Sequence, residues 1–246
     1  MYSFSEYSCF LNCPKKFYHQ YVKHLVPVET PSALTYGSEF HKGVAGLAEL
    51  SIPAQVGILA KRFFGTKPGE KAEVTMVTEL PNGVPFKYIA DAVSDDFIIE
   101  YKTTSRADSK TCTAQALSLQ LRIGALLFNR STALLRLVKK SAIRQRQNES
   151  PEQFDQRYLG EYEDKPSEHF QEIIIPNVAH VGTMAELCHL HDFIDKCVSK
   201  GIFPTAAPYA CYGMTCCSYM DLCSDPANSG HLYRIDDHYA NKEVGK

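Results

Sequence analysis

The stretch Ile98-Ile99-Glu100-Tyr101-Lys102-Thr103-Thr104-Ser105 places an acid and a lysine two residues apart in an otherwise apolar run. Its β-branched and aromatic residues predict a strand over 97–103, and the two-residue period of a strand puts Glu100 and Lys102 on one face. The simplest interpretation is a surface ion pair. The apolar neighbours argue against this interpretation, because they predict a buried strand. Two charges buried on such a strand need partners or a metal ion.

Two further strands are predicted before this one. Residues 73–80 and 86–93 alternate with a period of two, and Pro81-Asn82-Gly83 between them is a strong turn signal. A second turn at Asp95-Asp96 leads into the strand over 97–103. The three strands are therefore expected to form an antiparallel meander.

Asp91 lies near the end of the middle strand and is expected to approach Glu100 across the Asp95-Asp96 turn. Two converging carboxylates form a hard oxygen site, which suits Mg²⁺ or Mn²⁺. Lys102 beside them can neutralise charge on a phosphate or position an attacking water. These three residues are the candidate catalytic group.

Composition describes an ordinary globular protein: 246 residues, 44% hydrophobic, 22% charged, with a formal net charge of −2. The chain has no uninterrupted apolar run long enough for a transmembrane helix, so no membrane association is expected. Its first residues lack the pattern of a signal peptide, so a cytoplasmic location is expected. The nine cysteines are an odd number, which favours metal or cluster ligation over a disulfide framework.

Helical periodicity alternates with strand-like segments over the rest of the chain. Helices are predicted over residues 1–25, 38–50, 54–64, 113–128, 151–162 and 183–200, and strands over 133–138 and 170–175. The mixture predicts an α/β protein.

The order Asp91, then Glu100-Tyr101-Lys102, resembles the core of the PD-(D/E)xK nuclease superfamily. The RecB-type branch, with its CRISPR-associated-exonuclease-like members, is the most similar, although Ala90 stands where the family name has proline. Its G-x-x-x-H motif is matched by Gly37-Ser38-Glu39-Phe40-His41. The resemblance implies that a divalent metal is held by His41, Asp91, Glu100 and the backbone carbonyl of Tyr101, with Lys102 as a catalytic residue.

A glutamine follows the lysine in this family, usually as Q-x-x-x-Y on a helix. Gln120 is the best match and is expected to orient Lys102 or DNA, and Gln115 is a substitute. The tyrosine is absent, because position 124 is Gly124. A solvated helix face is the alternative interpretation of either glutamine.

The same branch often carries a [4Fe–4S] cluster that joins the chain ends. Cys13-Pro14-Lys15-Lys16-Phe17 resembles the context of its N-terminal ligand, and Cys211, Cys217 and Cys223 have the spacing of the other three. Cys216 is an alternative to Cys217. A structural Zn²⁺ ion is the alternative for the whole site.

The dense basic segment of the chain contains Lys139, Lys140, Arg144 and Arg146. Such a run is usually a solvated face. In a nuclease it would follow the phosphate backbone of DNA, and aromatic residues near the N-terminus would stack on single-stranded bases. Residues 144–170 resemble an insertion in phage-encoded relatives, which implies DNA processing, recombination or repair in a bacterial cell or by a phage.

We therefore expect one nuclease domain over residues 1–246, with a restriction-endonuclease-like core: a mixed central sheet flanked by helices, and chain ends joined by the iron–sulfur cluster. Its parts are an N-terminal helix over 1–30, a catalytic core over 36–140 and a cysteine cluster over 205–224. The expected activity is metal-dependent hydrolysis of DNA phosphodiesters, as a single-strand exonuclease. A non-catalytic DNA-binding or assembly subunit with the same fold and a zinc-stabilised structural protein are the alternatives. A helicase or recombination protein is a candidate partner.

Overall fold

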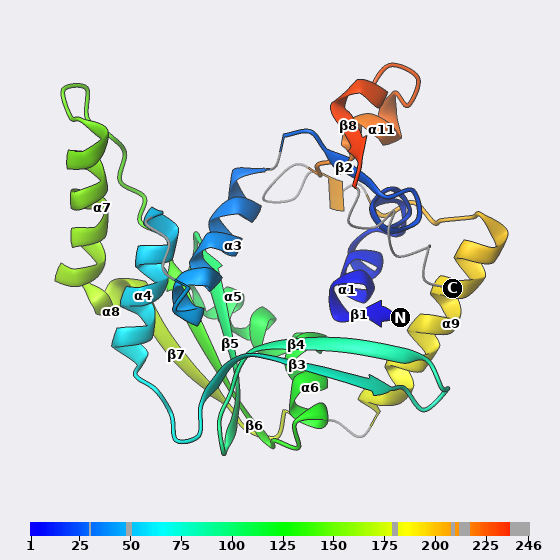
Figure 1. The fold of residues 1–246 in the computed structure, drawn as a ribbon, viewed down its shortest axis with the longest axis horizontal. Helices are drawn as coiled ribbons and strands as arrows, with labels where there is room; N and C mark the ends of the chain where they lie inside the picture. Colours follow the sequence, from blue (N-terminus) through cyan, green and yellow to red (C-terminus); the bar gives the residue numbers. More distant parts are fainter. Residues whose placement is uncertain (30, 48–50, 179–181, 208–209, 212–216, 237–246) are drawn as a thin grey trace. The chain divides into compact units, whose positions relative to one another are not determined.

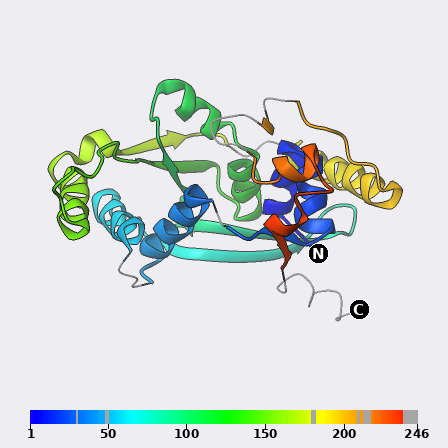
Figure 2. The same cartoon turned by 90° about the horizontal axis from the view of Figure 1, so that it is seen from above.

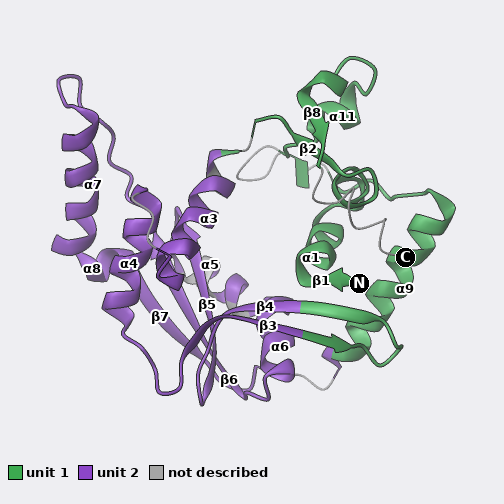
Figure 3. Cartoon of the chain, viewed as in Figure 1, with its two compact units in different colours: residues 1–31, 77–87, 184–246 green, residues 32–76, 88–183 purple. Residues whose placement is uncertain are grey.

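The computed structural model describes residues 1–29, 31–47, 51–178, 182–207, 210–211 and 217–236. The chain divides into two compact units (Figure 3). Unit 1 comprises residues 1–31, 77–87 and 184–246, and unit 2 comprises residues 32–76 and 88–183. The candidate catalytic and basic residues belong to unit 2, and the candidate cluster cysteines belong to unit 1.

The central sheet is mixed, and most of its residues belong to unit 2 (Figure 1). Strands β5 (Phe97–Thr104) and β6 (Thr132–Lys139) run parallel. β4 (Pro85–Val93) is antiparallel to β5, and β7 (Phe170–Ile175) is antiparallel to β6. β3 (Lys71–Glu79) pairs with β4. Figure 2 shows β6 and β7 side by side from a second direction. The expectation of an α/β fold with a mixed central sheet flanked by helices is confirmed.

Helices α3 (Ser32–Ala45), α4 (Ile52–Phe64) and α7 (Pro151–Asp164) contribute to the main core of unit 2. In this core, side chains of the helices join Ile99 and Tyr101 of β5. Because successive residues of a strand alternate faces, these two side chains define one face of the sheet. The face is apolar, which is typical of a sheet covered by helices.

The opposite face carries Ile98, Glu100 and Lys102, and helix α6 (Leu119–Leu127) packs there. A Cβ added at Gly124 of α6 would lie 3.0 Å from Ile98 Cγ1. Helix α5 (Ser109–Ala116) precedes α6, and the short helix α8 (Pro166–His169) leads into β7. α6 is therefore the helix nearest the charged face of β5.

Helices α3 and α4 cross in backbone contact. A Cβ on Gly43 would lie 1.9 Å from the carbonyl oxygen of Ala54, and a Cβ on Gly57 would lie 2.3 Å from that of Phe40. Only glycine permits so close an approach of two backbones. The crossing holds the turn of α3 that carries His41.

Unit 1 contains both ends of the described chain. Its N-terminal elements are β1 (Tyr2–Ser3), α1 (Phe4–Asn12), α2 (Pro14–Phe17), the π-helix η1 (Tyr18–Val22) and β2 (Leu25–Pro27). Its C-terminal elements are α11 (Met220–Ser224), the 3₁₀ helix η2 (Gly230–Leu232) and β8 (Tyr233–Ile235). The long helix α9 (Thr183–Lys200) begins at the boundary of the two units and continues in unit 1.

Two contacts tie these segments of unit 1 together. β2 pairs antiparallel with β8, and Tyr219, Leu222 and Tyr233 form a small core against Leu25. Hydrogen bonds from backbone groups and buried apolar contacts therefore join residues from opposite ends of the sequence.

Three predicted helices differ from the structure. The helix over 1–25 is broken at Cys13, since Pro14 lacks the N–H that would continue it. The helix over 113–128 is two helices, because Ser118 caps α6 by accepting a hydrogen bond from the backbone of Leu121. The helix predicted over 38–50 begins earlier, at Ser32, and ends at Ala45.

Among the described helices, none combines the length and hydrophobicity needed to cross a lipid bilayer.

Candidate active site

Strand β5 supplies the charged centre of the site. Glu100 is 1% exposed, whereas the side chain of Lys102 is 32% exposed, and the two form an ion pair. Apart from this ion pair, neither carboxylate oxygen of Glu100 accepts a hydrogen bond from the residues that the structure describes. A buried carboxylate with so few partners is unfavourable unless a cation offsets its charge.

Asp91 approaches Glu100 from β4. Its Oδ2 atom accepts a hydrogen bond from the backbone N–H of Tyr101 at 2.8 Å. Its Oδ1 atom lies 3.4 Å from Nδ1 of His41 on α3. The structure therefore brings His41 and Asp91 together beside the strand that carries Glu100.

Gln120 reaches the site from α6. The ammonium of Lys102 donates a hydrogen bond to Oε1 of Gln120 at 3.0 Å. Gln115 lies on the separate helix α5. The structure therefore brings Gln120, rather than its substitute, to the lysine.

Burial dominates the electrostatics of the site. It raises the pKa of Asp91 to about 6, although Lys102 opposes the shift. Burial, together with the nearby Asp91 carboxylate, raises the pKa of Glu100 to about 7. Burial alone would lower the pKa of Lys102, but the two carboxylates outweigh it and the net shift is upward. Burial lowers the pKa of His41, which favours the neutral imidazole that metals bind.

These donors fit a hard divalent cation: two carboxylates, an imidazole and the backbone carbonyl of Tyr101, the residue after Glu100. Within the described parts of the chain, however, no group of three or more His, Cys, Asp or Glu side chains is arranged to hold a metal ion. Lys102 instead neutralises Glu100, and Asp91 contacts Tyr101 N–H and His41. Binding of a cation would displace Lys102 from Glu100 and release protons from the carboxylates.

The predicted basic residues occupy two places in unit 2. In the parallel register of β5 and β6, Lys139 pairs with Thr104, so it shares the sheet face of Glu100 and Lys102. Lys140 lies on the opposite side, with its ammonium 4.1 Å from the centre of the Tyr36 ring. Lys139 is therefore the basic residue of this pair that faces the site.

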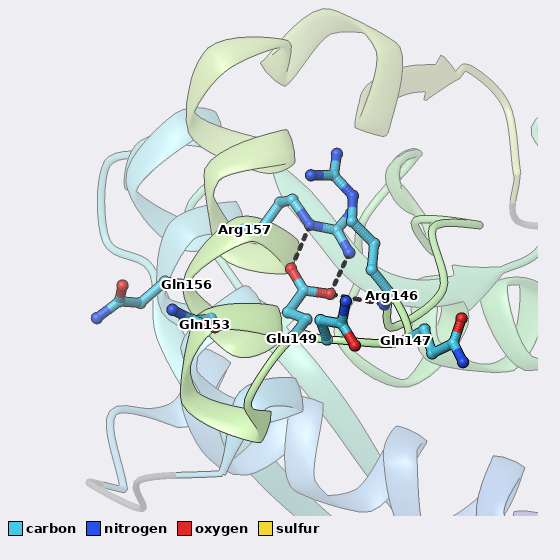
Figure 4. A pocket seen from close by; sticks show the side chains of 7 residues that line it. Arg146, Gln147, Glu149, Gln153, Gln156 and Arg157 are labelled. Atoms are coloured by element: carbon cyan, nitrogen blue, oxygen red, sulfur yellow. Dashed lines mark hydrogen bonds and ion pairs between the residues drawn. The ribbon is translucent and has the colours of Figure 1, made fainter.

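Arg144 and Arg146 belong to the loop before α7. The guanidinium of Arg157 on α7 donates to the backbone carbonyl of Arg144 and to the carboxylate of Glu149, which also accepts from the backbone N–H of Arg146. Arg146, Glu149 and Arg157 line a surface hollow of about 730 Å³ (Figure 4). Arg144 and Arg146 therefore belong to a loop bonded to Arg157 and Glu149, whereas Lys139 is the last residue of β6.

The candidate cluster cysteines belong to unit 1, and no three of the described ones are arranged to hold a metal ion. Cys13, Cys211, Cys217 and Cys223 are free thiols, and the backbone N–H of Cys217 donates to the carbonyl of Cys211 at 3.0 Å. Burial raises the pKa of the Cys223 thiol, and the neighbouring thiols of Cys13, Cys217 and Cys211 raise it further. Cys216 lies outside the described residues.

Residues 1–88 match the model of the PD-(D/E)XK nuclease superfamily. The match includes His41 and ends before Asp91, Glu100 and Lys102. The fold is also similar to two solved structures. The crystal structure of SSO0001 has 16% identity and a TM-score of 0.49, covering 92% of this chain and 85% of that one. The phage-related exonuclease from Haemophilus somnus 129PT has 13% identity and a TM-score of 0.45, covering 71% and 75%. No curated protein matches this chain.

Two residues near the site were not predicted from the sequence. Tyr88 of β4 donates a hydrogen bond to the backbone carbonyl of Gln120 at 3.0 Å. Arg136 of β6 is completely buried and donates to the hydroxyl of Tyr101. The sequence around Tyr88 does not indicate its hydrogen-bond partner, because a tyrosine is an ordinary residue of an alternating strand. An arginine inside the apolar run over 133–138 is such a signal, because a buried arginine requires anionic or polar partners.

Proposed function

We propose that this chain is a metal-dependent nuclease that hydrolyses phosphodiester bonds of DNA. The buried Glu100 carboxylate carries the proposal, because its described neighbours offer it only the ammonium of Lys102. Asp91 and His41 add donors of the type that Mg²⁺ or Mn²⁺ binds. The match of residues 1–88 to a nuclease superfamily supports the same chemistry.

In this proposal His41, Asp91, Glu100 and the carbonyl of Tyr101 hold one or two divalent ions. Such an ion lowers the pKa of a bound water and polarises the phosphate. The chain's own residues supply the rest of the chemistry.

Lys102 orients the attacking water and stabilises the negative charge that develops on the phosphate. Gln120 holds the Lys102 ammonium through its side-chain oxygen, 3.0 Å away. A lysine fixed in this way needs little reorganisation during the reaction, which is the condition for a large electrostatic contribution.

The proposed substrate is single-stranded DNA, cut from an end, during DNA processing in a bacterial cell or by a phage. Lys139 supports a DNA substrate, because it shares the sheet face of Lys102 and can contact the phosphate next to the one that is cut. Lys140, Arg144 and Arg146 would contact the backbone farther from the site. A helicase or recombination protein would supply the single strand.

We also propose that Cys13, Cys211, Cys217 and Cys223 hold a [4Fe–4S] cluster in unit 1, with Cys216 as the alternative to Cys217. The influence of the Cys13, Cys217 and Cys211 thiols on the pKa of Cys223 supports the proposal. Four thiolates also suit Zn²⁺, which is the competing occupant.

The activity is tested with protein purified anaerobically and end-labelled single-stranded DNA, in Mg²⁺ or Mn²⁺. Lys102→Met should lower the rate by about 10²–10³-fold, as loss of one preorganised electrostatic group does in other enzymes. Lys71→Met removes an exposed lysine of β3 and should leave the rate unchanged. A circular single strand should resist cleavage, because an exonuclease needs an end.

If the unmutated protein leaves DNA uncut with every metal tried, the enzyme proposal is lost. DNA binding without cleavage would then identify a non-catalytic DNA-binding or assembly subunit.

The cluster is tested separately, by iron and sulfide analysis of the same preparation. About four irons per chain are expected, and Cys13→Ser should abolish them. Cys188→Ser, a control in α9, should retain them. A colourless protein that releases zinc would replace the iron–sulfur proposal with the zinc alternative.

A further inference from the structure

Helix α6 approaches β4 closely at one glycine. A Cβ added at Gly124 would lie 2.5 Å from the hydroxyl oxygen of Tyr88. Tyr88 is 1% exposed and its ring packs edge-on against Phe128 at 6.3 Å, so it has little room to move. The tyrosine hydroxyl therefore fills the space that a side chain at position 124 would need.

The same hydroxyl also forms a hydrogen bond with α6, one helical turn before Gly124. Tyr88 donates to the backbone carbonyl of Gln120 at 3.0 Å. In an α-helix this carbonyl also accepts the N–H of residue 124, and its second lone pair is free for such a bond. The bond attaches the first turns of α6 to the middle of β4.

Gln120 carries this restraint to the charged centre. Its backbone accepts from Tyr88, and its side-chain oxygen accepts from the ammonium of Lys102 at 3.0 Å. Lys102 in turn pairs with the buried Glu100. A continuous series of bonds therefore runs from Tyr88 through Gln120 to Lys102.

We propose that Tyr88 is a positioning residue that acts through Gln120 to fix the ammonium of Lys102, and that Gly124 is required because it leaves room for the Tyr88 hydroxyl. The inference deepens the proposed nuclease function and rests on it for the catalytic consequence. It also explains the glycine at position 124: any side chain there would push α6, and with it Gln120, away from Lys102.

The test measures how fast Lys102 reacts with an amine-specific acylating reagent at one fixed pH, read by mass spectrometry on metal-free protein. Tyr88→Phe keeps the ring and removes only the hydroxyl. It should raise the labelling of Lys102 by about fivefold, the equivalent of one ordinary hydrogen bond. Labelling of Lys71 in the same sample provides the internal standard.

Two further variants separate positioning from general loosening. The single variant Gln120→Ala should raise the labelling of Lys102. Adding Tyr88→Phe should raise it no further, because Gln120→Ala has already removed the hydrogen bond through which Tyr88 acts on Lys102. Tyr162→Phe removes another buried hydroxyl of unit 2, which contacts Ser141 and Tyr158, and should leave Lys102 unchanged.

Unchanged labelling in Tyr88→Phe would overturn the inference, as would additive effects in the double variant or an equal effect of Tyr162→Phe. In cleavage assays Tyr88→Phe should lower kcat and leave KM unchanged, because Lys102 acts on the transition state. Failure of the unmutated protein to cut DNA would remove the nuclease proposal while the labelling result still decides the role of Tyr88.

Discussion

Arg136 lies directly opposite Tyr101 in the parallel register of β5 and β6, and its guanidinium donates to the Tyr101 hydroxyl at 2.5 Å. The same guanidinium donates to Glu172 at 2.9 Å and lies 3.5 Å from Glu70. This buried group holds the side chain of Tyr101 on the face of β5 opposite to Glu100 and Lys102. β5 therefore has charged groups on both faces: Glu100 and Lys102 on one, and the buried Arg136 guanidinium against the other.

Arg136→Met should destabilise unit 2 by about 3–5 kcal/mol, because it leaves the buried Glu70 carboxylate without its cation. Urea denaturation followed by circular dichroism measures the change. Lys165→Met, which removes the exposed partner of Glu161, should cause little change. Equal stabilities of the two variants would contradict the assigned role of Arg136.

Gly43→Ala should destabilise the protein by about 1–3 kcal/mol, because the new methyl group would overlap the Ala54 carbonyl where α3 and α4 cross. Gly160→Ala is the matched control in α7, where a Cβ meets nothing within 4 Å. It should stabilise the protein by about 0.5–1 kcal/mol, the usual gain from replacing a helical glycine by alanine. A gain in stability in Gly43→Ala, like the gain expected for Gly160→Ala, would contradict the contact between α3 and α4.

In the metal-free protein, the contribution of Asp91 and Glu100 to stability should fall as the pH rises from about 4 to about 7. Burial raises the folded-state pKa of Asp91 to about 6 and of Glu100 to about 7. Within this window these two carboxyls bind more protons in the folded state than in the unfolded state, so their contribution to the free energy of unfolding falls with increasing pH. Thermal unfolding in the presence of a chelator measures this slope.

Glu100→Gln should flatten this pH dependence, and Glu163→Gln, on the exposed side of α7, should not. Mn²⁺ should restore stability at pH 7 in the unmutated protein, because it binds the folded state only. A pH slope that persists in Glu100→Gln would assign it to other groups.

Lys139→Ala should weaken binding of single-stranded DNA and lower the magnitude of the slope of log K against log salt by about 0.7, as expected for one lost phosphate contact. Lys140→Ala should have a smaller effect, because its ammonium already lies over the Tyr36 ring. Titrations at several salt concentrations with a catalytically inactive Lys102→Met background measure both. A larger effect for Lys140 would place the DNA on the other side of the sheet.

Local patterns in the sequence predicted the central strands well. Alternation and the Pro81-Asn82-Gly83 turn predicted β3, β4 and β5 within two residues at each end. The strands β6 and β7 were predicted equally well, since their apolar runs are short and bounded by polar residues. The pairing of β5 with β6 needs contacts between distant segments, which periodicity does not reveal.

The candidate site was predictable only in part for the same reason. Spacing put Glu100 and Lys102 on one face, and the family resemblance pointed to His41 and Gln120. Neither could reveal that Lys102 bonds Gln120, nor that Tyr88 holds the backbone of that glutamine. The roles of these residues in catalysis stay predictions until the variants are measured.

The pairing of β2 with β8 has a consequence for synthesis on the ribosome. It joins Leu25 to Ile235, so β2 has no strand partner until almost the whole described chain has been translated. At about 5–20 residues per second the wait is on the order of ten seconds or more. Unit 2, whose residues end at 183, is complete much earlier. The newly made protein therefore passes through a stage in which all its candidate catalytic residues have been synthesised but Cys211, Cys217 and Cys223 have not.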